Sequence, residues 1–363
     1  MTTEPIKPRR SNSRQTGAPT ITDVARLAQV SPMTVSRVIN AESNVRASTR
    51  EAVQAAITAL NYAPNRSARR LAGAGQLRLG LLFSNPSDAY LSAFLLGSLE
   101  QASRADTQLI VQKCELDDHE REVAARLIAS GVDGIILPPP LCDSPLVLDL
   151  LRDAGVPTVV VATSHPRAGF GAVSIDDRAA AQEMTQHLLD LGHQRIGFIT
   201  GNPNLTASDE RLAGYRAALE GRGIAFDADL VAHGLFTYRS GLDAAEELLD
   251  RDDPPTAVFA SNDDMAAAAV AMAHRRGLDV PGDFTVVGFD DSAIARTIWP
   301  ELTTIHQPIA EMSRMGVELL AGMLRDRRNG GSAEPQHLVL GYTLIRRQSD
   351  AAPRQRPRVR QRG

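Results

Sequence analysis

Apolar residues recur at the spacing of an α-helix in two short segments near the start of the chain. The first segment opens with Thr20, and Asp23 follows three residues later, as expected at a capped helix N-terminus. The second opens with Ser31, a common N-cap residue, and Pro32 follows where the first turn of a helix tolerates proline. The predicted buried positions are Ile21, Val24, Ala25 and Ala28, then Val35, Val38 and Ile39. We therefore predict two short helices joined by a tight turn that Val30 closes.

The outward face of the second predicted helix carries small polar residues, a methionine and one arginine. These residues are Met33, Thr34, Ser36, Arg37 and Asn40. A short helix with such a face is suited to reading the major groove of DNA. An ordinary helical hairpin is the alternative interpretation. The two caps at this spacing favour a DNA-binding helix-turn-helix.

A third helix is predicted from about Ala47 to Asn61, and its apolar stripe would complete a three-helix domain. The stripe consists of Val53, Ile57 and Leu60. After Pro64, the residues NRSARRLAG predict one or two helical turns that end at Gly73. Because so short a helix is unstable alone, we expect it to order only against a partner. Residues 1–19 are polar and contain several prolines, so we expect a disordered tail.

The pattern changes at Leu77, where short apolar runs typical of buried strands begin to alternate with helical segments. About ten such strands are predicted, which favours parallel sheets in two doubly wound α/β lobes. Polar residues gather where the predicted strands end: SNPSD after Phe83, TGNPN after Ile199, SNDD after Ala260 and DDS after Phe289. Ligands of such folds bind at the carboxyl ends of the strands. The pattern therefore predicts a small-molecule cleft.

Charge is distributed unevenly along the chain, although the net charge of −4 does not itself suggest nucleic acid. Residues 1–19, 20–72 and 346–363 carry formal charges of +3, +4 and +6, so the remainder carries −17. A basic front end on an acidic body is typical of a DNA-binding module joined to another domain.

Several other functional classes are disfavoured by what the sequence lacks. The two cysteines, Cys114 and Cys142, have no metal-ligand spacing, and we expect packed, reduced thiols rather than a disulfide. No signal peptide and no run of about 18 apolar residues occurs, so we expect a cytoplasmic protein. No nucleophile elbow, P-loop or GxGxxG motif after a strand is present, and His193 and His306 are isolated. We therefore expect no enzyme, metal or cofactor.

Seven segments, taken in order and spacing, resemble the lactose-repressor (LacI/GalR) family of transcription regulators. They are ITDVARLAQVSPMTVSRVIN, TREAVQAAITALNYAPNRSARRLAG, LGHQRIGFITG, ERLAGYRAAL, FASNDDMAAAAV, FTVVGFDD and LTTIHQP, and they cover roughly residues 20–346. The resemblance implies an all-α helix-turn-helix headpiece, a hinge helix, and a periplasmic-binding-protein-like α/β core that dimerises and binds a small effector, often a sugar or its relative.

With this resemblance, the domain boundaries are predicted as follows. The disordered tail covers residues 1–19, the helix-turn-helix domain 20–63, the hinge helix and linker 64–75, the core 76–346 and a basic disordered tail 347–363. Within the core, one lobe is expected to combine about 76–174 with 308–335, and the other 175–307 with 336–346.

The resemblance also implies which residues contact double-stranded DNA, a pseudo-palindromic operator. Pro32 and Met33 occupy the variable specificity positions, and Arg37 the usually basic one, which reaches guanine or a phosphate. Leu71 matches the leucine that wedges into the minor groove, although a surface or dimer-packing leucine is the alternative. The full predicted set is Thr20, Ser31, Pro32, Met33, Thr34, Ser36, Arg37, Asn40, Tyr62, Asn65, Arg66, Arg69 and Leu71.

For the effector, the resemblance places Arg211, Asn262 and Asp290 as polar ligand groups and Phe236 as a stacking ring. Gln307 is expected at the crossover between the lobes. The full predicted set is Asp88, Tyr90, Leu91, Ile175, Arg211, Phe236, Asn262, Asp290 and Gln307. An arginine, carboxylate or amide groups and an aromatic ring suit a polyhydroxylated ligand. Asp263 is interpreted instead as a helix N-cap.

The chain departs from the family pattern at several positions. Gln29 replaces the usual glycine of the turn, at a cost of about 1 kcal/mol if it is left-handed. Ala162 and Thr163 replace an aspartate and a basic residue, so one usual contact to the effector is missing. The run Pro138–Pro140 stiffens another pocket edge. The tail after residue 350 has no leucine heptads, so we expect a dimer rather than a tetramer; its arginines either add non-specific DNA affinity or only solubilise the chain.

The leading functional hypothesis is a transcription regulator, a repressor by preference, whose affinity for its operator is coupled to effector binding. The sign of the coupling stays open, so an activator or co-repressor type is retained. The alternative from another class is a solute-binding protein without DNA regulation. The sequence does not identify the effector, which could be a sugar, a sugar acid or a related metabolite.

Overall fold

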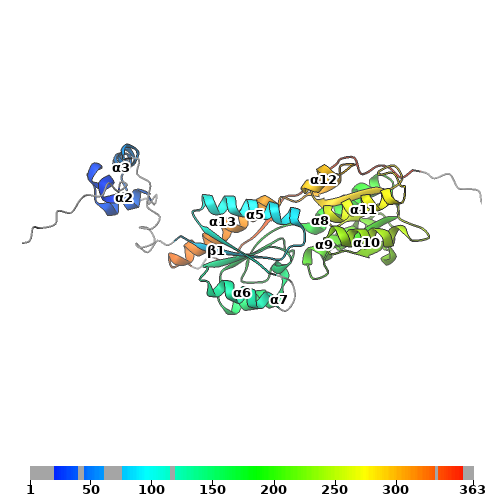
Figure 1. Cartoon of the computed structure of the whole chain (residues 1–363), viewed down its shortest axis with the longest axis horizontal. Helices are drawn as coiled ribbons and strands as arrows, with labels where there is room; N and C mark the ends of the chain where they lie inside the picture. Colours follow the sequence, from blue (N-terminus) through cyan, green and yellow to red (C-terminus); the bar gives the residue numbers. More distant parts are fainter. Residues whose placement is uncertain (1–19, 40–44, 61–75, 115–118, 332–333, 355–363) are drawn as a thin grey trace, which may run out of the picture. The chain divides into compact units, whose positions relative to one another are not determined.

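The computed structural model describes residues 20–39, 45–60, 76–114, 119–331 and 334–354 (Figure 1). The chain divides after residue 76 into two units, and each is described by itself. The predicted tail 1–19 and hinge helix 64–75 lie outside the described residues. So do the predicted DNA contacts Asn40, Tyr62, Asn65, Arg66, Arg69 and Leu71.

The first unit contains the three predicted helices, α1 (Ile21–Leu27), α2 (Pro32–Ile39) and α3 (Ala47–Ala59). Their apolar faces meet in a small core of Val24, Ala25, Val35, Val38, Val53 and Ala56. The Asp23 carboxylate accepts the N–H and the hydroxyl of Thr20 at 3.0 and 2.7 Å, which closes the start of α1. Gln29 has φ +54°, so the turn is left-handed without the usual glycine. The sequence pattern thus predicts this unit correctly.

In the second unit, the first lobe is a six-stranded, all-parallel sheet in the order β11-β5-β4-β3-β1-β2. Its strands are β1 (Arg78–Phe83), β2 (Gln108–Lys113), β3 (Gly134–Leu137), β4 (Thr158–Val161), β5 (Gly171–Ile175) and β11 (His337–Leu340). Helices α5 (Asp88–Arg104) and α13 (Ile309–Arg328) cover one face, and α6 (Glu120–Ala129) and α7 (Pro145–Asp153) the other (Figure 1).

The second lobe is also six-stranded, in the order β12-β10-β9-β8-β6-β7, with only β12 antiparallel. Its strands are β6 (Ile196–Thr200), β7 (Val231–His233), β8 (Ala257–Ala260), β9 (Thr285–Asp290), β10 (Thr303–His306) and β12 (Thr343–Ile345). Helix α8 (Asp177–Asp190) packs on α9 (Thr206–Gly221), and α10 (Tyr238–Leu249) on α11 (Asp263–Arg275). The short α12 (Ala293–Thr297) follows β9.

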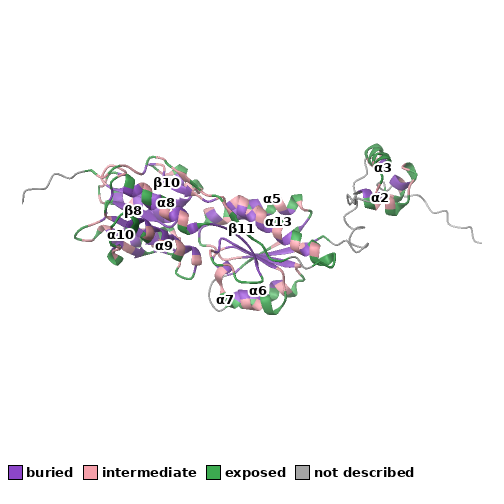
Figure 2. Cartoon of the chain, turned by 180° about the vertical axis from the view of Figure 1, so that it is seen from behind, coloured by how far each residue is buried: buried purple, intermediate pink, exposed green. Residues whose placement is uncertain are grey.

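The central strands of both lobes are buried on both faces, as Figure 2 shows. This burial explains their continuous apolar runs, because parallel strands are covered by helices on each side. The predicted fold class, a helix-turn-helix headpiece with two doubly wound α/β lobes, is confirmed. Cys114 and Cys142 both lie buried.

Two predicted boundaries differ from the structure. Strand β11 pairs with β5, so residues 337–340 belong to the first lobe rather than the second. Residues 347–354 are ordered rather than part of a disordered tail. The buried hydroxyl of Ser349 donates to the carbonyl of Val286 at 2.5 Å, and the Asp350 carboxylate contacts His187 Nε2 at 2.7 Å. The arginine-rich composition of the segment predicted disorder, because composition does not reveal a few specific contacts with distant residues.

Candidate ligand pocket and DNA-reading helix

A cavity lies between the two lobes of the core, at the carboxyl ends of their strands. The first lobe contributes Asn85, Pro86, Ser87, Tyr90, Pro139, Pro140 and Ala162; the second contributes Asn202, Leu205, Ala207, Arg211, Phe236, Asn262, Asp290 and Gln307. Six of the nine predicted effector residues therefore line one cavity: Tyr90, Arg211, Phe236, Asn262, Asp290 and Gln307.

The other three predicted effector residues do not line the cavity. Asp88 is exposed in the first turn of α5, and the adjacent Ser87 is the residue that caps this helix. Leu91 is a half-buried residue of the same helix, outside the cavity lining. Ile175 ends β5 with its side chain in the hydrophobic core. These three residues therefore lie outside the lining, because position along a loop or strand does not determine which way a side chain points, and their contact with an effector stays a prediction.

Several lining residues were not named from the sequence, although a signal for most of them was present. Asn85 and Ser87 lie in the polar segment after β1, and Asn202 lies in the one after β6. Pro139 and Pro140 belong to the proline run already noted. The predicted strand ends therefore identified the correct segments but not the individual side chains.

Arg211 is the cationic group of the cavity wall, and the protein holds it rigidly. Its Nε donates to Asp177 Oδ1 at 2.8 Å, and its Nη1 donates to the carbonyl of Ser261 at 2.6 Å. The guanidinium also lies 3.6 Å from the centroid of the Phe289 ring, a cation–π contact. Arg211 and Asp177 are both buried. A rigid guanidinium whose charge is already balanced suits a ligand without a strong negative charge.

Asp290 is a buried carboxyl group of the cavity wall. Burial raises its pKa well above the ordinary value, against the opposing effect of Arg211. Its Oδ1 accepts from Gln307 Nε2 at 3.0 Å. This bond orients the amide so that Gln307 Oε1 is left as a hydrogen-bond acceptor.

Two buried polar atoms of the cavity wall have no hydrogen-bond partner within the described part of the chain. They are Tyr90 Oη and Gln307 Oε1. Leaving such an atom unsatisfied costs about 1–3 kcal/mol, which a ligand hydroxyl can recover. The pair therefore points to a ligand that offers hydrogen bonds in the interior of the cavity.

Three non-glycine residues of the cavity wall have a left-handed backbone. Their φ angles are +60° at Ala162, +60° at Phe236 and +111° at Asp290. The ring of Phe236 lies so close to Gly201 that a Cβ there would come within 1.9 Å of Cζ. Backbone strain of this kind, about 1–3 kcal/mol for each residue, gathers at functional sites.

Asn262 and Asp263 divide their roles differently from the prediction. Asn262 caps α11, since its Oδ1 accepts from the N–H of Met265 at 3.0 Å, and its Nδ2 donates to the carbonyl of Phe236 at 3.1 Å. Asp263 accepts from the N–H of Ser292 and the hydroxyl of Thr304, both at 2.7 Å. The helix cap is therefore Asn262, while the buried Asp263 links the start of α11 to Ser292 and to Thr304 of β10.

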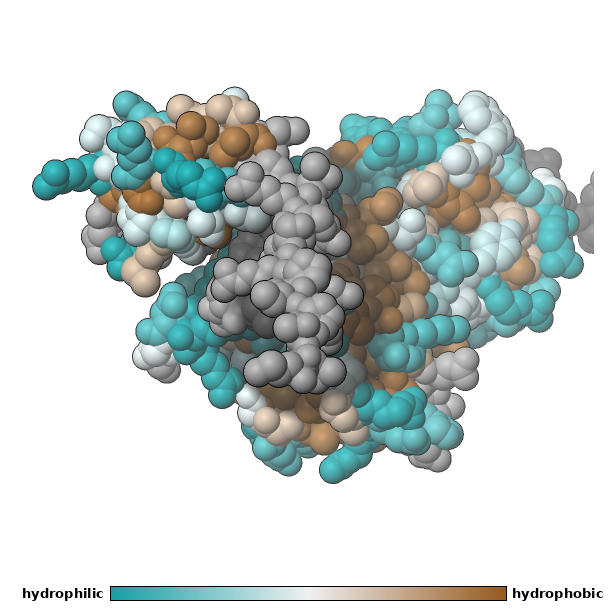
Figure 3. Space-filling view, turned by 60° about the vertical axis from the view of Figure 1, so that its left-hand side comes forward, coloured by the Kyte–Doolittle hydropathy of each residue, from teal (hydrophilic) through white to brown (hydrophobic). Residues whose placement is uncertain are grey.

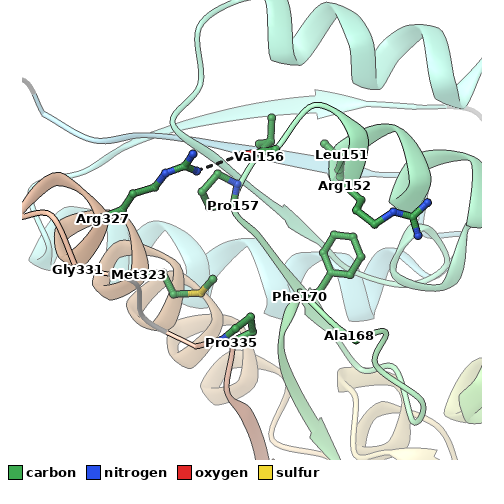
Figure 4. Close-up of a pocket in the computed structure, with 12 residues that line it drawn as sticks. Leu151, Arg152, Val156, Pro157, Ala168, Phe170, Met323, Arg327, Gly331 and Pro335 are labelled. Carbon is green, nitrogen blue, oxygen red and sulfur yellow. Dashed lines mark hydrogen bonds between the residues drawn. The ribbon is translucent and has the colours of Figure 1, made fainter.

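A larger hollow of about 330 Å³ lies elsewhere on the first lobe (Figure 4). It is lined mainly by apolar side chains, among them Phe170 and Met323, beside the segments that precede β4 and β5. Arg327 at its edge donates to the carbonyl of Gly155 at 3.2 Å. None of the predicted effector residues lines this hollow.

The interlobe cavity, in contrast, encloses about 40 Å³, which is room for a few water molecules at most. A larger ligand therefore enters only if the lobes or side chains move.

The α2 helix presents the predicted DNA-reading face. Met33 is 65% exposed, and Arg37, one turn further on, donates from Nη2 to the Met33 sulfur at 3.7 Å. Pro32 is exposed, whereas Thr34 and Ser36 are half-buried. The Ser31 hydroxyl accepts the N–H of Thr34 at 3.1 Å, so Ser31 caps the helix, as predicted.

His193 and His306 have contacts within the protein. His193 bridges the Thr256 hydroxyl and the carbonyl of Ala351, each at 2.8 Å, and His306 Nδ1 lies 3.1 Å from Asp291. In the described ranges, no group of three or more His, Cys, Asp or Glu side chains is placed to hold a metal ion. Among the helices described, none is both long and apolar enough to cross a membrane.

Comparison with protein-family models matches both units of the chain. Residues 20–65 match the bacterial regulatory proteins of the lacI family, and residues 185–349 match a periplasmic binding protein-like domain. The chain is 37% identical to the transcriptional regulator CelR of Thermobifida fusca, over 91% of this chain and 98% of that protein. It is 34% identical to GalR of Escherichia coli, over 92% and 96%.

Solved structures agree with these matches. A CelR–cellobiose complex aligns with a TM-score of 0.69 at 36% identity, covering 91% of this chain and 99% of that one. A lac repressor dimer bound to operator and an anti-inducer aligns with a TM-score of 0.69 at 30% identity, covering 93% and 100%. The chain belongs to the lacI family of bacterial regulatory proteins and is a transcriptional regulator rather than an enzyme. The relatives lend no support to the alternative of a solute-binding protein.

Proposed function

We propose that this chain represses transcription as a homodimer in the cytoplasm and that a neutral, polyhydroxylated effector in the interlobe cavity controls its affinity for a pseudo-palindromic operator. The two unpartnered atoms Tyr90 Oη and Gln307 Oε1 carry the effector part of the proposal. The balanced charge of Arg211 and Asp177 favours a neutral sugar over a sugar acid.

Apolar surface on the outside of the core supports self-association. Leu96 and Leu99 on α5, and Val111 on the adjacent β2, are 65%, 51% and 41% exposed. On the side of the core that Figure 3 shows, patches of hydrophobic residues (brown) also reach the surface. A dimer would place two α2 helices for two half-sites of an operator.

The first test of the effector is thermal unfolding of the full chain with cellobiose, the sugar in the CelR complex, followed by other neutral disaccharides and matched sugar acids. A true effector at 100 times its Kd is expected to stabilise the core by about 2.7 kcal/mol. Adding it to the chain on a DNA fragment selected from the genome then shows whether it releases or strengthens DNA binding. The proposal fails if no neutral sugar stabilises the core while a sugar acid does.

Replacing Arg37 with alanine is expected to weaken binding to the selected fragment by about tenfold to a hundredfold, because a base-reading arginine contributes about 1–3 kcal/mol. Binding to a random duplex and effector binding should change much less. Fluorescence anisotropy on both duplexes measures the ratio.

The matched control for this variant is Arg26→Ala, which removes an exposed arginine of the same unit from α1. It should reduce both affinities alike and only slightly. An equal loss of selected and random DNA binding in Arg37→Ala would remove Arg37 from the base-reading residues.

A further inference from the structure

A carboxylate joins the two lobes beside the interlobe cavity. Asp143 lies in the first lobe, in the short 3₁₀ turn Leu141–Asp143 between β3 and α7. Its Oδ2 accepts the N–H and the hydroxyl of Thr206, the first residue of α9 in the second lobe, both at 3.0 Å. Its Oδ1 accepts the hydroxyl of Thr163, from its own lobe, at 2.5 Å. Three donors thus converge on one carboxylate, and two of them come from the other lobe.

Hydrogen bonds continue from this bridge to the cavity wall. The N–H of Ser164, next to Thr163 in the first lobe, donates to Thr206 Oγ1 at 2.9 Å. The Ser164 hydroxyl lies 3.1 Å from Asp177 Oδ2, and the other oxygen of Asp177 holds Arg211. The bridge is therefore linked to the cationic group of the cavity.

A second connection joins the lobes through Ser87 of the first lobe. Its hydroxyl donates to Asp264 Oδ2, on α11 of the second lobe, at 2.6 Å. Ser87 lines the cavity, and so does Leu205, the neighbour of Thr206. The cavity lining therefore includes a residue of one connection and the sequence neighbour of a residue of the other.

The bridge includes one of the two residues, 162 and 163, at which this sequence departs from the family pattern. Ala162 lines the cavity, but its side chain has no polar group for a ligand. The Thr163 hydroxyl is directed to Asp143. At these two positions, then, Ala162 has no polar side chain, and the Thr163 hydroxyl is directed to Asp143 rather than to the cavity lining.

We propose that Asp143 and Thr206 are positioning residues that hold the lobes closed without an effector, so that a ligand must first break this bridge to enter. The proposal deepens the proposed function because it concerns the same cavity. Its test requires neither effector nor DNA, so its failure is distinguishable from failure of the effector proposal.

The test measures the distance between the lobes by double electron–electron resonance on the full chain. Spin labels are placed at position 122 on α6 and position 239 on α10, where the native side chains are 64% and 83% exposed. Cys114 and Cys142 are buried, so the reagent selects the introduced cysteines. Excess unlabelled chain suppresses signals between protomers. The wild type is expected to give one short interlobe distance.

Two variants break the bridge in different ways. Asp143→Asn keeps the shape of the side chain but replaces one carboxylate oxygen with an NH₂ group. That group cannot accept a hydrogen bond, so the donor of Thr163 or of Thr206 loses its acceptor. Thr206→Val removes the hydroxyl and keeps the N–H. Each is expected to raise the ratio of open to closed chains at least tenfold, seen as a second, longer distance.

Two control variants distinguish the effect of breaking the bridge from the effect of removing any buried hydroxyl. Thr206→Ser restores the hydroxyl and should restore the short distance. Thr185→Val removes a buried hydroxyl whose hydrogen bond, among the described residues, is to the carbonyl of Ala181 within α8, and it should leave the distance unchanged. The proposal is overturned if Asp143→Asn and Thr206→Val both keep the wild-type distribution, or if the wild type is already as open as these variants.

Discussion

Replacing Arg211 with leucine is expected to lower the free energy of unfolding of the core by about 3–5 kcal/mol, because the variant leaves Asp177 buried without its ionic partner. The same change removes the cationic wall of the interlobe cavity, so effector-induced stabilisation should disappear. Urea unfolding of the full chain measures the first effect, and thermal shift with the effector found by screening measures the second. DNA binding should persist at temperatures where the variant core is folded.

A second substitution separates stability from ligand recognition. In the double variant Arg211→Leu with Asp177→Leu, no buried charge is left unpaired, so most of the lost stability should return. The effector response should not return, because the guanidinium is still absent.

Arg239→Leu is the matched control for these variants. It breaks an exposed pair with Asp243 and should cost less than about 1 kcal/mol. An effector response of normal size in Arg211→Leu would show that Arg211 is not part of the binding site.

Raising the pH from about 4 to about 7 is expected to destabilise the wild-type core relative to the variant Asp263→Asn, by up to about 4 kcal/mol. Burial raises the pKa of Asp263 from its ordinary value of 3.8 to about 7. Between these values the folded state holds a proton that the unfolded state has lost. Ionisation therefore opposes folding, and stability falls by roughly 1.4 kcal/mol for each pH unit. Below pH 4 and above pH 7 the difference should be constant.

Comparison with the variant separates the titration of Asp263 and its electrostatic partner Asp290 from that of the other groups that titrate in the same pH range. Burial lowers the pKa of His193, so its effect on stability has the opposite sign, while that of Asp290 has the same sign. The effect of His193 is common to wild type and variant and cancels in the difference. The charge of Asp263 is one of the causes of the raised pKa of Asp290, so Asp263→Asn lowers that pKa too, and the difference reports the titration of Asp263 together with its effect on Asp290. The amide of Asp263→Asn can accept from the Ser292 N–H and donate to the Thr304 hydroxyl. Urea unfolding at pH 4, 5.5, 7 and 8 gives the difference; a constant value across this range would contradict the prediction.

The sequence alone predicts features that depend on neighbours within a few residues. The caps at Thr20 and Ser31, the apolar faces of α1 to α3, and the buried parallel strands follow from local periodicity and helix-terminus chemistry. The polar strand ends also predicted where the cavity forms, because parallel strands end at one edge. The roles of particular cavity residues came from the family resemblance, and three of the residues it named, Asp88, Leu91 and Ile175, do not line the cavity.

Tertiary structure alone decided the partners that complete the site. Arg211 meets Asp177 across 34 residues of sequence, and Thr206 meets Asp143 across 63. No local pattern marks such pairs, because they form only when two strand ends or two lobes come together. The order of residues 347–354 has the same origin, since Ser349 and Asp350 are held by strand β9 and helix α8, far away in sequence. Local chemistry therefore determined the elements and the edge where a ligand binds, while long-range packing decided which charges are balanced there and what holds the lobes closed.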